Sequence, residues 1–201
     1  MSRRLAVVKL GGSHALSPLL MGWLDAIGRA AGGIVLVPGG GPFADAVRAA
    51  QAAMRFDDEA AHDMALMAMS QYARALASLA PEFVIAADPG TIRTALRQNN
   101  VPVWSPWPML RAHPDIPRSW EVTSDSLAVW LAGVLGADRV VLIKHRAASA
   151  DRDVPALVRD GLVDPAFPRF VAGFAGRVQI AGPDDLAQPG TLLGGHSAEA
   201  A

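Results

Sequence analysis

A lysine and two glycines stand close together near the start of the sequence, in the run Lys9-Leu10-Gly11-Gly12-Ser13. Glycines let backbone N–H groups approach an anion closely, and a helix that begins there adds partial positive charge. The compact lysine ammonium adds a full charge and three rotatable donors, which arginine cannot imitate. The run therefore indicates a site for a phosphoryl group; an ordinary glycine turn beside a solvated lysine is the alternative.

A second glycine-rich run, residues 37–42, contains Gly39, Gly40 and Gly41 between two prolines. Three consecutive glycines lose much backbone entropy on folding, so a functional reason for them is expected. Two such turns after neighbouring parallel strands lie side by side at the carboxyl edge of the sheet, where open α/β folds bind ligands. Together the turns predict a site for two phosphoryl-bearing groups. No P-loop motif of the form G-x-x-x-x-G-K-S/T occurs.

The third candidate is the run Trp-Glu-Val-Thr-Ser-Asp-Ser at residues 120–126, which precedes a helix-like stretch and a strand that ends at Lys144. One of the residues 123–126 is expected to cap the helix, and Asp125 suits its positive end. Asp125 is also placed to orient a lysine. Lys9 and Lys144 are the only lysines among 18 basic residues. Composition alone can explain that bias, but both lysines are candidates for a role at the site.

Short apolar runs alternate with helix-like stretches along the chain. Continuous Val/Ile/Leu runs suit strands buried on both faces, and the repeated strand–helix order predicts an α/β fold with a largely parallel sheet. We expect a loop at residues 105–120, and residues 145–176 show no clear pattern. Strands are predicted at Leu5–Leu10, Ile34–Val37, Phe83–Ala87, Val101–Trp104, Arg139–Ile143, Val178–Ala181 and Thr191–Leu193, and helices at 16–31, 43–54, 58–79, 90–98 and 124–136.

The helix predicted at 58–79 is rich in alanine and methionine and begins at Asp57 or Asp58. Small and flexible side chains permit close packing on more than one side, so this helix is expected at a contact between subunits. His62 on the same helix binds a ligand if it faces the glycine turns, and is a core residue otherwise. The apolar stripe of the helix comprises Ala61, Met64, Ala65, Ala68, Tyr72, Leu76 and Leu79.

Composition narrows the class of protein. The chain has 201 residues, 51% hydrophobic and 18% charged, which suits one domain with a large core. A net charge of −1 gives no field that attracts nucleic acid. Without cysteine there is no disulfide or thiolate chemistry, and the histidines show no close pair that predicts a metal site. No apolar run suits a signal peptide or a membrane helix, so a cytoplasmic protein without membrane contact is expected.

In this order the three runs resemble the amino acid kinase family, which includes acetylglutamate, aspartate, uridylate and isopentenyl phosphate kinases. The resemblance covers roughly residues 5–144. Within the family, the short length, residues 58–65 and residues 120–126 are most similar to a small branch. This branch comprises the (5-(aminomethyl)furan-3-yl)methyl phosphate kinases of methanofuran and methylofuran synthesis.

The resemblance implies a three-layer αβα sandwich in one domain over residues 1–201. Residues 1 to about 120 would form the acceptor side and residues from about 121 to 194 the nucleotide side. It also implies transfer of the γ-phosphoryl group of ATP, with Mg²⁺ brought by the nucleotide, to a small phosphate monoester, which becomes a diphosphate. A homodimer or a larger homo-oligomer is expected.

The family pattern also implies roles for single residues. Lys9 would hold the bridge between the β- and γ-phosphates, Asp125 would orient the lysines, and His62 would bind the acceptor phosphate. Phosphate-binding roles fall on Gly11, Gly12, Ser13, Gly39, Gly40, Gly41 and Ser124.

The sequence departs from the family after the fifth strand. Relatives carry Thr-Asp-x-x-Gly-Val there and a later Gly-Gly-Met-x-x-Lys, whereas this chain has Lys144-His145-Arg146 and no later lysine. Either Lys144 replaces the later lysine at the nucleotide phosphates, or it is a solvated lysine at a strand end and nucleotide binding is weakened or lost. A catalytically silent relative that binds a phosphorylated metabolite or oxyanion, as sensor, carrier or storage subunit, is therefore the alternative function.

Overall fold

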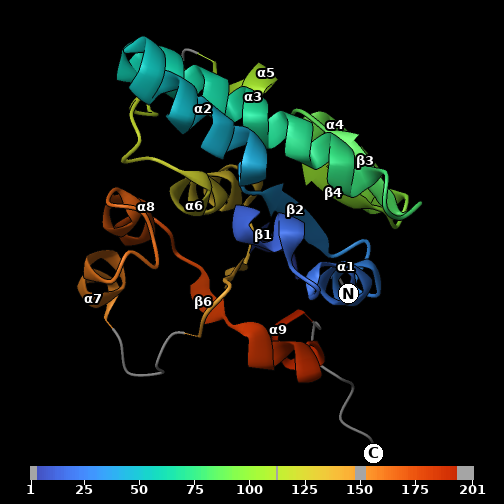
Figure 1. The fold of residues 1–201 in the computed structure, drawn as a ribbon. Coiled ribbons are helices and arrows are strands. Elements are labelled where there is room, and N and C mark those ends of the chain that lie inside the picture. The colour runs from blue at the N-terminus through green and yellow to red at the C-terminus, as the bar shows by residue number, and fades with distance from the viewer. Residues whose placement is uncertain (1–3, 112, 148–152, 194–201) are drawn as a thin grey trace, which may run out of the picture.

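Over the residues that the structure describes, the sheet has six strands in the order β3-β4-β2-β1-β5-β6, and every neighbouring pair is parallel. The structure, a computed structural model, describes residues 4–111, 113–147 and 153–193. Helices lie on both sides of the sheet (Figure 1), which confirms the predicted α/β class. The strands are Ala6–Leu10 (β1), Ile34–Pro38 (β2), Phe83–Ala86 (β3), Val101–Trp104 (β4), Arg139–Ile143 (β5) and Arg177–Ala181 (β6).

The helices connect these strands in the expected alternation. Among the described residues, no helix has both the length and the apolar character that crossing a bilayer requires. The α-helices are Leu20–Gly28 (α1), Gly41–Met54 (α2), Asp58–Ala77 (α3), Pro89–Arg97 (α4), Trp107–Leu110 (α5), Ser124–Leu135 (α6), Val154–Arg159 (α7), Phe167–Ala172 (α8) and Gly190–Leu193 (α9), and 3-10 helices span Gly12–Leu16 (η1) and Pro183–Ala187 (η2).

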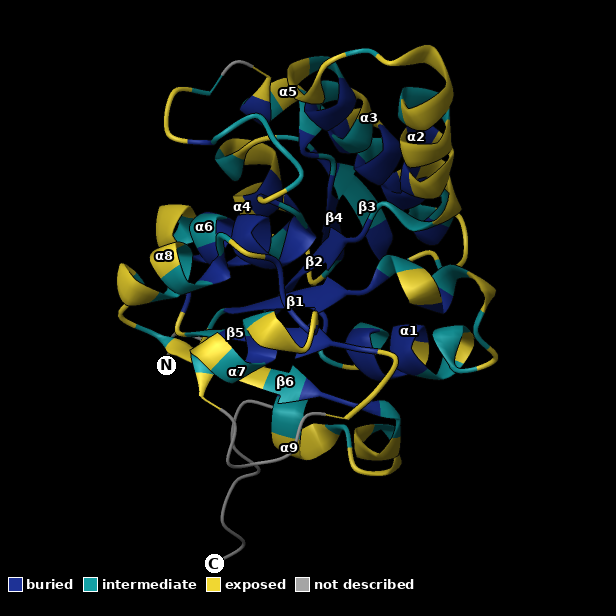
Figure 2. Ribbon diagram, turned by 60° about the vertical axis from the view of Figure 1, so that its left-hand side comes forward, coloured by how far each residue is buried: buried dark blue, intermediate teal, exposed yellow. Residues whose placement is uncertain are grey.

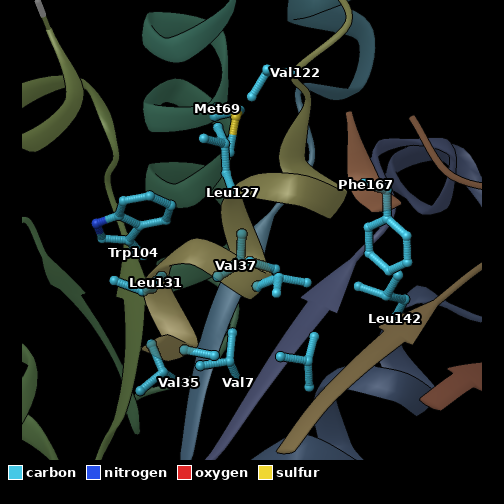
Figure 3. Packing of buried hydrophobic residues seen from close by; sticks show 14 of the residues in the cluster. Val7, Val35, Val37, Met69, Trp104, Val122, Leu127, Leu131, Leu142 and Phe167 are labelled. Carbon is cyan, nitrogen blue, oxygen red and sulfur yellow. The ribbon is translucent and has the colours of Figure 1, made fainter. Parts of the chain in front are cut away.

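The two faces of the sheet belong to two apolar clusters. Val7 of β1 and Leu142 of β5 pack with Leu131 of α6 and Phe167 of α8 (Figure 3). Ala6, Val8 and Leu10 face the other way and pack with α1. The central strands are buried, and exposed residues lie on the outer surfaces of the helices, in loops and on the edge strand β6 (Figure 2). Since successive side chains of a strand alternate between faces, Lys9 lies on the Val7 face, toward α6.

Two predicted helix ends are confirmed. Asp57, and not Asp58, caps α3: its carboxylate accepts a hydrogen bond from the Ala60 amide at 2.8 Å. α6 ends at Gly136, whose φ of 67° is the left-handed conformation that glycine adopts easily. These local signals fix where α3 begins and where α6 ends.

Three predictions about secondary structure are wrong in part. The helix expected at 16–31 is shorter, because Pro18 lacks an N–H and Ser17 before it is extended; η1 ends at Leu16, and α1 spans only Leu20–Gly28. The strand expected at Thr191–Leu193 is the end of α9, whose Leu193 is buried against the α1 side of the sheet. The loop expected at 105–120 contains the short helix α5.

Candidate active site

The first feature of the site is a meeting of Lys9, Asp125 and Lys144 at the carboxyl ends of β1 and β5. These two strands pair in parallel, and the Gly11 amide donates to the Ile143 carbonyl at 3.1 Å beyond the last pair. Lys144 follows Leu142 by two residues and therefore shares its face of the sheet. That face is covered by α6, which carries Asp125 in its first turn. Strand periodicity thus directs both lysines to one carboxylate.

The three side chains form a compact ionic cluster. The Asp125 carboxylate lies 2.9 Å from Lys9 Nζ and accepts from Lys144 Nζ at 2.7 Å with each oxygen. Lys9, Asp125 and Lys144 are 5%, 4% and 7% exposed. The interpretation of Lys144 as a solvated lysine at a strand end is therefore wrong.

Charges within the cluster shift the pKa values of its members. Burial alone would raise the pKa of Asp125, but Lys9 and Lys144 outweigh it and hold that pKa below its usual value. Burial and repulsion from Lys9 lower the pKa of Lys144 to about 8, although Asp125 opposes them. Two ammonium groups share one carboxylate, so the protonated cluster carries an excess positive charge. That charge suits a polyanionic ligand.

The two glycine turns pack against each other, backbone to backbone. A Cβ atom on Gly12 would lie 2.3 Å from the Gly41 nitrogen, and one on Gly39 would lie 2.3 Å from the Gly12 nitrogen. Gly41 has a φ of 55°, a conformation that favours glycine. A side chain on Gly12 or Gly39 would push the turns apart. The expectation that the turns lie side by side at the carboxyl edge is confirmed.

Two cavities meet at these turns. The glycine cavity, of about 270 Å³, lies between the turns and helices α2, α3 and α6. The lysine cavity, of about 300 Å³, lies over the ends of β1 and β5. Residues that line both cavities are Gly12, Ser13, Trp120 and Thr123.

Every residue that the sequence singled out lines one of these cavities. The lysine cavity receives Lys9, Gly11, Asp125 and Lys144, and Gly12 and Ser13 border both. The glycine cavity receives the remaining predicted residues: Gly39, Gly40, Gly41, His62 and Ser124.

His62 borders the glycine cavity as a neutral ring. Its Nδ1 lies 3.1 Å from the Ser119 carbonyl oxygen, which can only accept, so Nδ1 carries the hydrogen. Burial lowers the pKa of His62, and its Nε2 is buried with no partner among the described residues. With the hydrogen on Nδ1, Nε2 can accept a hydrogen bond but cannot donate one. Binding of a phosphate by His62 therefore requires protonation of the ring, and it stays a prediction.

Several residues at the site carried no signal in the sequence. Arg48 lies over the ring of Trp120 at 4.3 Å, and the Trp120 indole donates to Gln51 at 2.7 Å. These contacts fix the position of Trp120 between the two cavities. Asp45 and Arg48 line the glycine cavity from the exposed side of α2. Because all these contacts join segments distant in the sequence or lie on a solvated helix face, no local pattern reveals them.

Asp164 is a further residue of the site that the sequence did not reveal. It lies in the wall of the lysine cavity and is buried, within the stretch 145–176 that showed no pattern. Its carboxylate holds the first turn of α6.

The sequence of this chain is similar to those of known phosphate-transferring proteins. The sequence profile of the amino acid kinase family matches residues 4–147. A (5-(aminomethyl)furan-3-yl)methyl phosphate kinase from Methanocaldococcus jannaschii is 26% identical over 139 residues. That match covers 68% of this chain and 63% of the relative.

Solved structures show a similar fold. Uridylate kinase from Archaeoglobus fulgidus superimposes with a TM-score of 0.67 at 16% identity, covering 94% of each chain. UMP kinase from Ureaplasma parvum gives a TM-score of 0.65 at 12% identity, covering 90% of this chain and 91% of its own. The family profile, which spans well over half of the chain, and the shared αβα fold lead to one conclusion: the chain belongs to the amino acid kinase family.

Proposed function

We propose that this protein is a kinase that transfers the γ-phosphoryl group of ATP to a small phosphate monoester and releases ADP and a diphosphate. The observation that carries the proposal is the buried Lys9–Asp125–Lys144 cluster next to the place where the two cavities meet. Such an arrangement suits phosphoryl transfer, which depends on positioning and charge stabilisation more than on covalent chemistry.

The lysine cavity fits the phosphates of the donor. Lys9 and Lys144 face it, and the Asp125 carboxylate between them neutralises only one of their two charges. Lys9 is adjacent to the first glycine turn and is placed to meet the group in transfer, while Lys144 is placed to meet the other donor phosphates. Mg²⁺ that arrives with ATP would supply further positive charge. The glycine cavity then holds the acceptor on the opposite side of Gly12 and Ser13.

The chemistry of the site favours a phosphate as the acceptor. The reaction forms a bond from an acceptor phosphate oxygen to the γ-phosphorus and breaks the bond from that phosphorus to the β–γ bridging oxygen. A phosphate monoester loses its second proton near pH 6, so its attacking oxygen is already ionised at neutral pH. No general base is then required. This agrees with the engagement of the lysine-cavity carboxylates Asp125 and Asp164 by protein donors.

For the acceptor we propose (5-(aminomethyl)furan-3-yl)methyl phosphate, the compound in the name of the relative from Methanocaldococcus jannaschii. Met69, Val122 and Leu127, which lie together in Figure 3, offer an apolar wall for a flat ring. Asp45 lies one helical turn, about 6 Å, beyond the start of α2 at Gly41. A phosphate at the glycine turns and an ammonium group near Asp45 would match this spacing.

A silent binding protein is the second candidate. The run Lys144-His145-Arg146, which stands where relatives have Thr-Asp-x-x-Gly-Val, favours it. Titration with a non-hydrolysable ATP analogue and Mg²⁺ separates the two functions. We expect saturable binding that Lys144→Ala weakens, whereas a silent member would bind a phosphorylated metabolite without the nucleotide.

The continuous six-stranded sheet supports the proposal that residues 1–201 form one domain with an acceptor side and a nucleotide side. Residue 194, the proposed end of the nucleotide side, lies outside the described residues. The use of ATP makes the cytoplasm the proposed location.

The pH dependence of catalysis gives a test of Lys144. Because the pKa of Lys144 is about 8, its ammonium is lost as the pH rises through that value. We expect kcat/KM for ATP to fall on the alkaline side of about pH 8. Lys144→Arg should remove this alkaline limb, because a guanidinium stays charged, although its planar shape should restore only part of the activity. If kcat/KM of Lys144→Arg still falls above about pH 8 as in wild type, the fall is due to another group.

We also propose a homodimer that forms through α2 and α3. Phe43 and Met67 are half-exposed beside Trp107, around a shallow surface cavity of about 540 Å³. Light scattering at micromolar concentration should give at least twice the 21.0 kDa of the chain. Met67→Glu should lower the measured mass toward that of a monomer. Val134→Glu, at an exposed apolar position on α6, should leave the mass unchanged. A wild-type monomer would contradict the proposal.

A further inference from the structure

The start of α6 is capped by a residue far away in the sequence. Thr123 occupies the N-cap position but makes no side-chain capping bond of its own. Instead, the Asp164 carboxylate accepts from the backbone amides of Thr123 at 3.0 Å and Ser126 at 3.1 Å. It also accepts from the hydroxyls of Thr123, at 2.8 Å, and Ser126. A carboxylate 38 residues downstream of Ser126 thus does what a local cap usually does.

Asp164 also belongs to the wall of the lysine cavity. Residues 161–165 form this wall, and the Ala166 amide donates to the Glu121 carbonyl at 3.1 Å beside it. The family profile ends at residue 147, before this segment. The residue that fixes the start of α6 therefore comes from a part of the chain that the profile does not cover.

Asp125 lies between the two residues that Asp164 holds. Thr123 precedes it by two positions and Ser126 follows it directly, so any movement of this turn moves the Asp125 carboxylate relative to Lys9 and Lys144. A displacement of one ångström at a reacting site can lower the rate by about a hundredfold.

We propose that Asp164 is a positioning residue. It fixes the first turn of α6, so that the Asp125 carboxylate keeps its contacts with both lysines and the wall of the lysine cavity keeps its position beside them. The inference rests on the proposed kinase function for its effect on rate. Its structural part stands independently, because the position of Asp125 can be measured without any substrate.

The two lysines make that measurement simple. Labelling with ¹³Cε-lysine gives one signal from Lys9 and one from Lys144, and Lys144→Arg assigns them. The charged and titratable groups near Lys144 are Lys9 of β1, Asp125 of α6, His14 of η1, His145 and, in the wall of the same cavity, Asp164. Of these, Asp125 is the group that raises the pKa of Lys144, so a displaced Asp125 lowers that pKa further.

The experiment compares ligand-free wild type with Asp164→Asn and Ser126→Ala. Both variants should lower the titration midpoint of Lys144 by about half a pH unit or more. Ser126→Ala changes no charge, so a shift there reports movement of the turn. Combining the two changes should give less than the sum of the single shifts, because both act through one contact. Asp153→Asn is the matched control: Asp153 caps α7 in the same part of the chain, and asparagine caps equally well.

Turnover supplies the second readout. In Asp164→Asn we expect kcat to fall by about tenfold or more, as for the loss of a residue that orients a catalytic group. KM for the acceptor should also change, because the turn that Asp164 holds brings Thr123 and Ser124 to the glycine cavity. Unchanged Lys144 titration in both variants, or the same shift in Asp153→Asn, would overturn the inference. A different outcome separates the two proposals. If the titration midpoint of Lys144 shifts in both variants but the wild-type protein never releases ADP, the proposed reaction is rejected and the positioning role of Asp164 stands.

Discussion

Lys9→Met should lower kcat by about a hundredfold or more, because it removes a transition-state contact worth about 3 kcal/mol. Lys9 stands two residues before Gly11 of the first glycine turn, and its ammonium lies in the lysine cavity at 2.9 Å from Asp125. Methionine has a similar length and an apolar end, so the core should survive the change. Initial rates of ADP release under saturating ATP and acceptor measure the effect.

The control for this experiment is a comparison of the folds of Lys9→Met and wild type. Circular dichroism spectra of Lys9→Met and wild type should agree, since the substitution leaves the Asp125–Lys144 pair intact. The KM for the acceptor should also stay close to the wild-type value. If Lys9→Met turns over at the wild-type rate, Lys9 has no part in the transfer and the assignment of the site is wrong.

Asp125→Asn should reduce both stability and turnover. It leaves two buried ammonium groups without a counter-ion, and removal of one partner from a buried ionic group costs about 3 kcal/mol or more. Because the pKa of Asp125 is lowered in the fold, the carboxylate stays charged through neutral pH and its contribution is lost only in acid. The free energy of unfolding from urea titration at neutral pH measures the loss.

Binding of tripolyphosphate gives a second test of the role of Asp125. The two unpaired ammonium groups should gain more from an anion than the wild-type cluster does, so tripolyphosphate should raise the melting temperature of the variant by more. Asp57→Asn, which replaces the α3 cap by an equally good one, should behave as wild type. A variant as stable as wild type, with no added response to tripolyphosphate, would show that the cluster is not held by Asp125.

Sequence periodicity predicts the part of the site that regular structure builds. β1 and β5 are short apolar runs, and alternation along each strand places Lys9 and Lys144 on one face. The positions of the glycine turns and of the start of α6 follow from the sequence in the same way, since each turn follows a strand and the helix begins after Thr123. The expectation that a residue among 123–126 caps α6 is wrong, because the Asp164 carboxylate accepts from the amides of this turn instead. The same reasoning failed for 16–31, where one proline at position 18 interrupts the helix, and for Thr191–Leu193, which is too short for any period to show.

Long-range contacts account for what the sequence did not reveal. Asp164 acts at α6 from a segment without periodicity, and Trp120 is placed by Gln51 and Arg48 on α2. Each of these contacts joins segments that only the folded sheet brings together. Two residues of the apolar stripe predicted on the helix at 58–79 are exposed. Met64 is left at the surface by the way α3 packs on α2 and the sheet, and Leu79 lies beyond the end of α3 at Ala77.

Product analysis by ³¹P NMR tests the proposed reaction most directly. The protein is incubated with ATP, Mg²⁺ and (5-(aminomethyl)furan-3-yl)methyl phosphate, beside uridylate and isopentenyl phosphate as competing acceptors. We predict that the monoester signal of the furan compound is replaced by the two coupled signals of a diphosphate, in equal amount to the ADP formed, and that Lys9→Met forms neither. Persistence of every monoester signal, with ATP unchanged, would contradict the conclusion that this member of the family is a phosphate kinase.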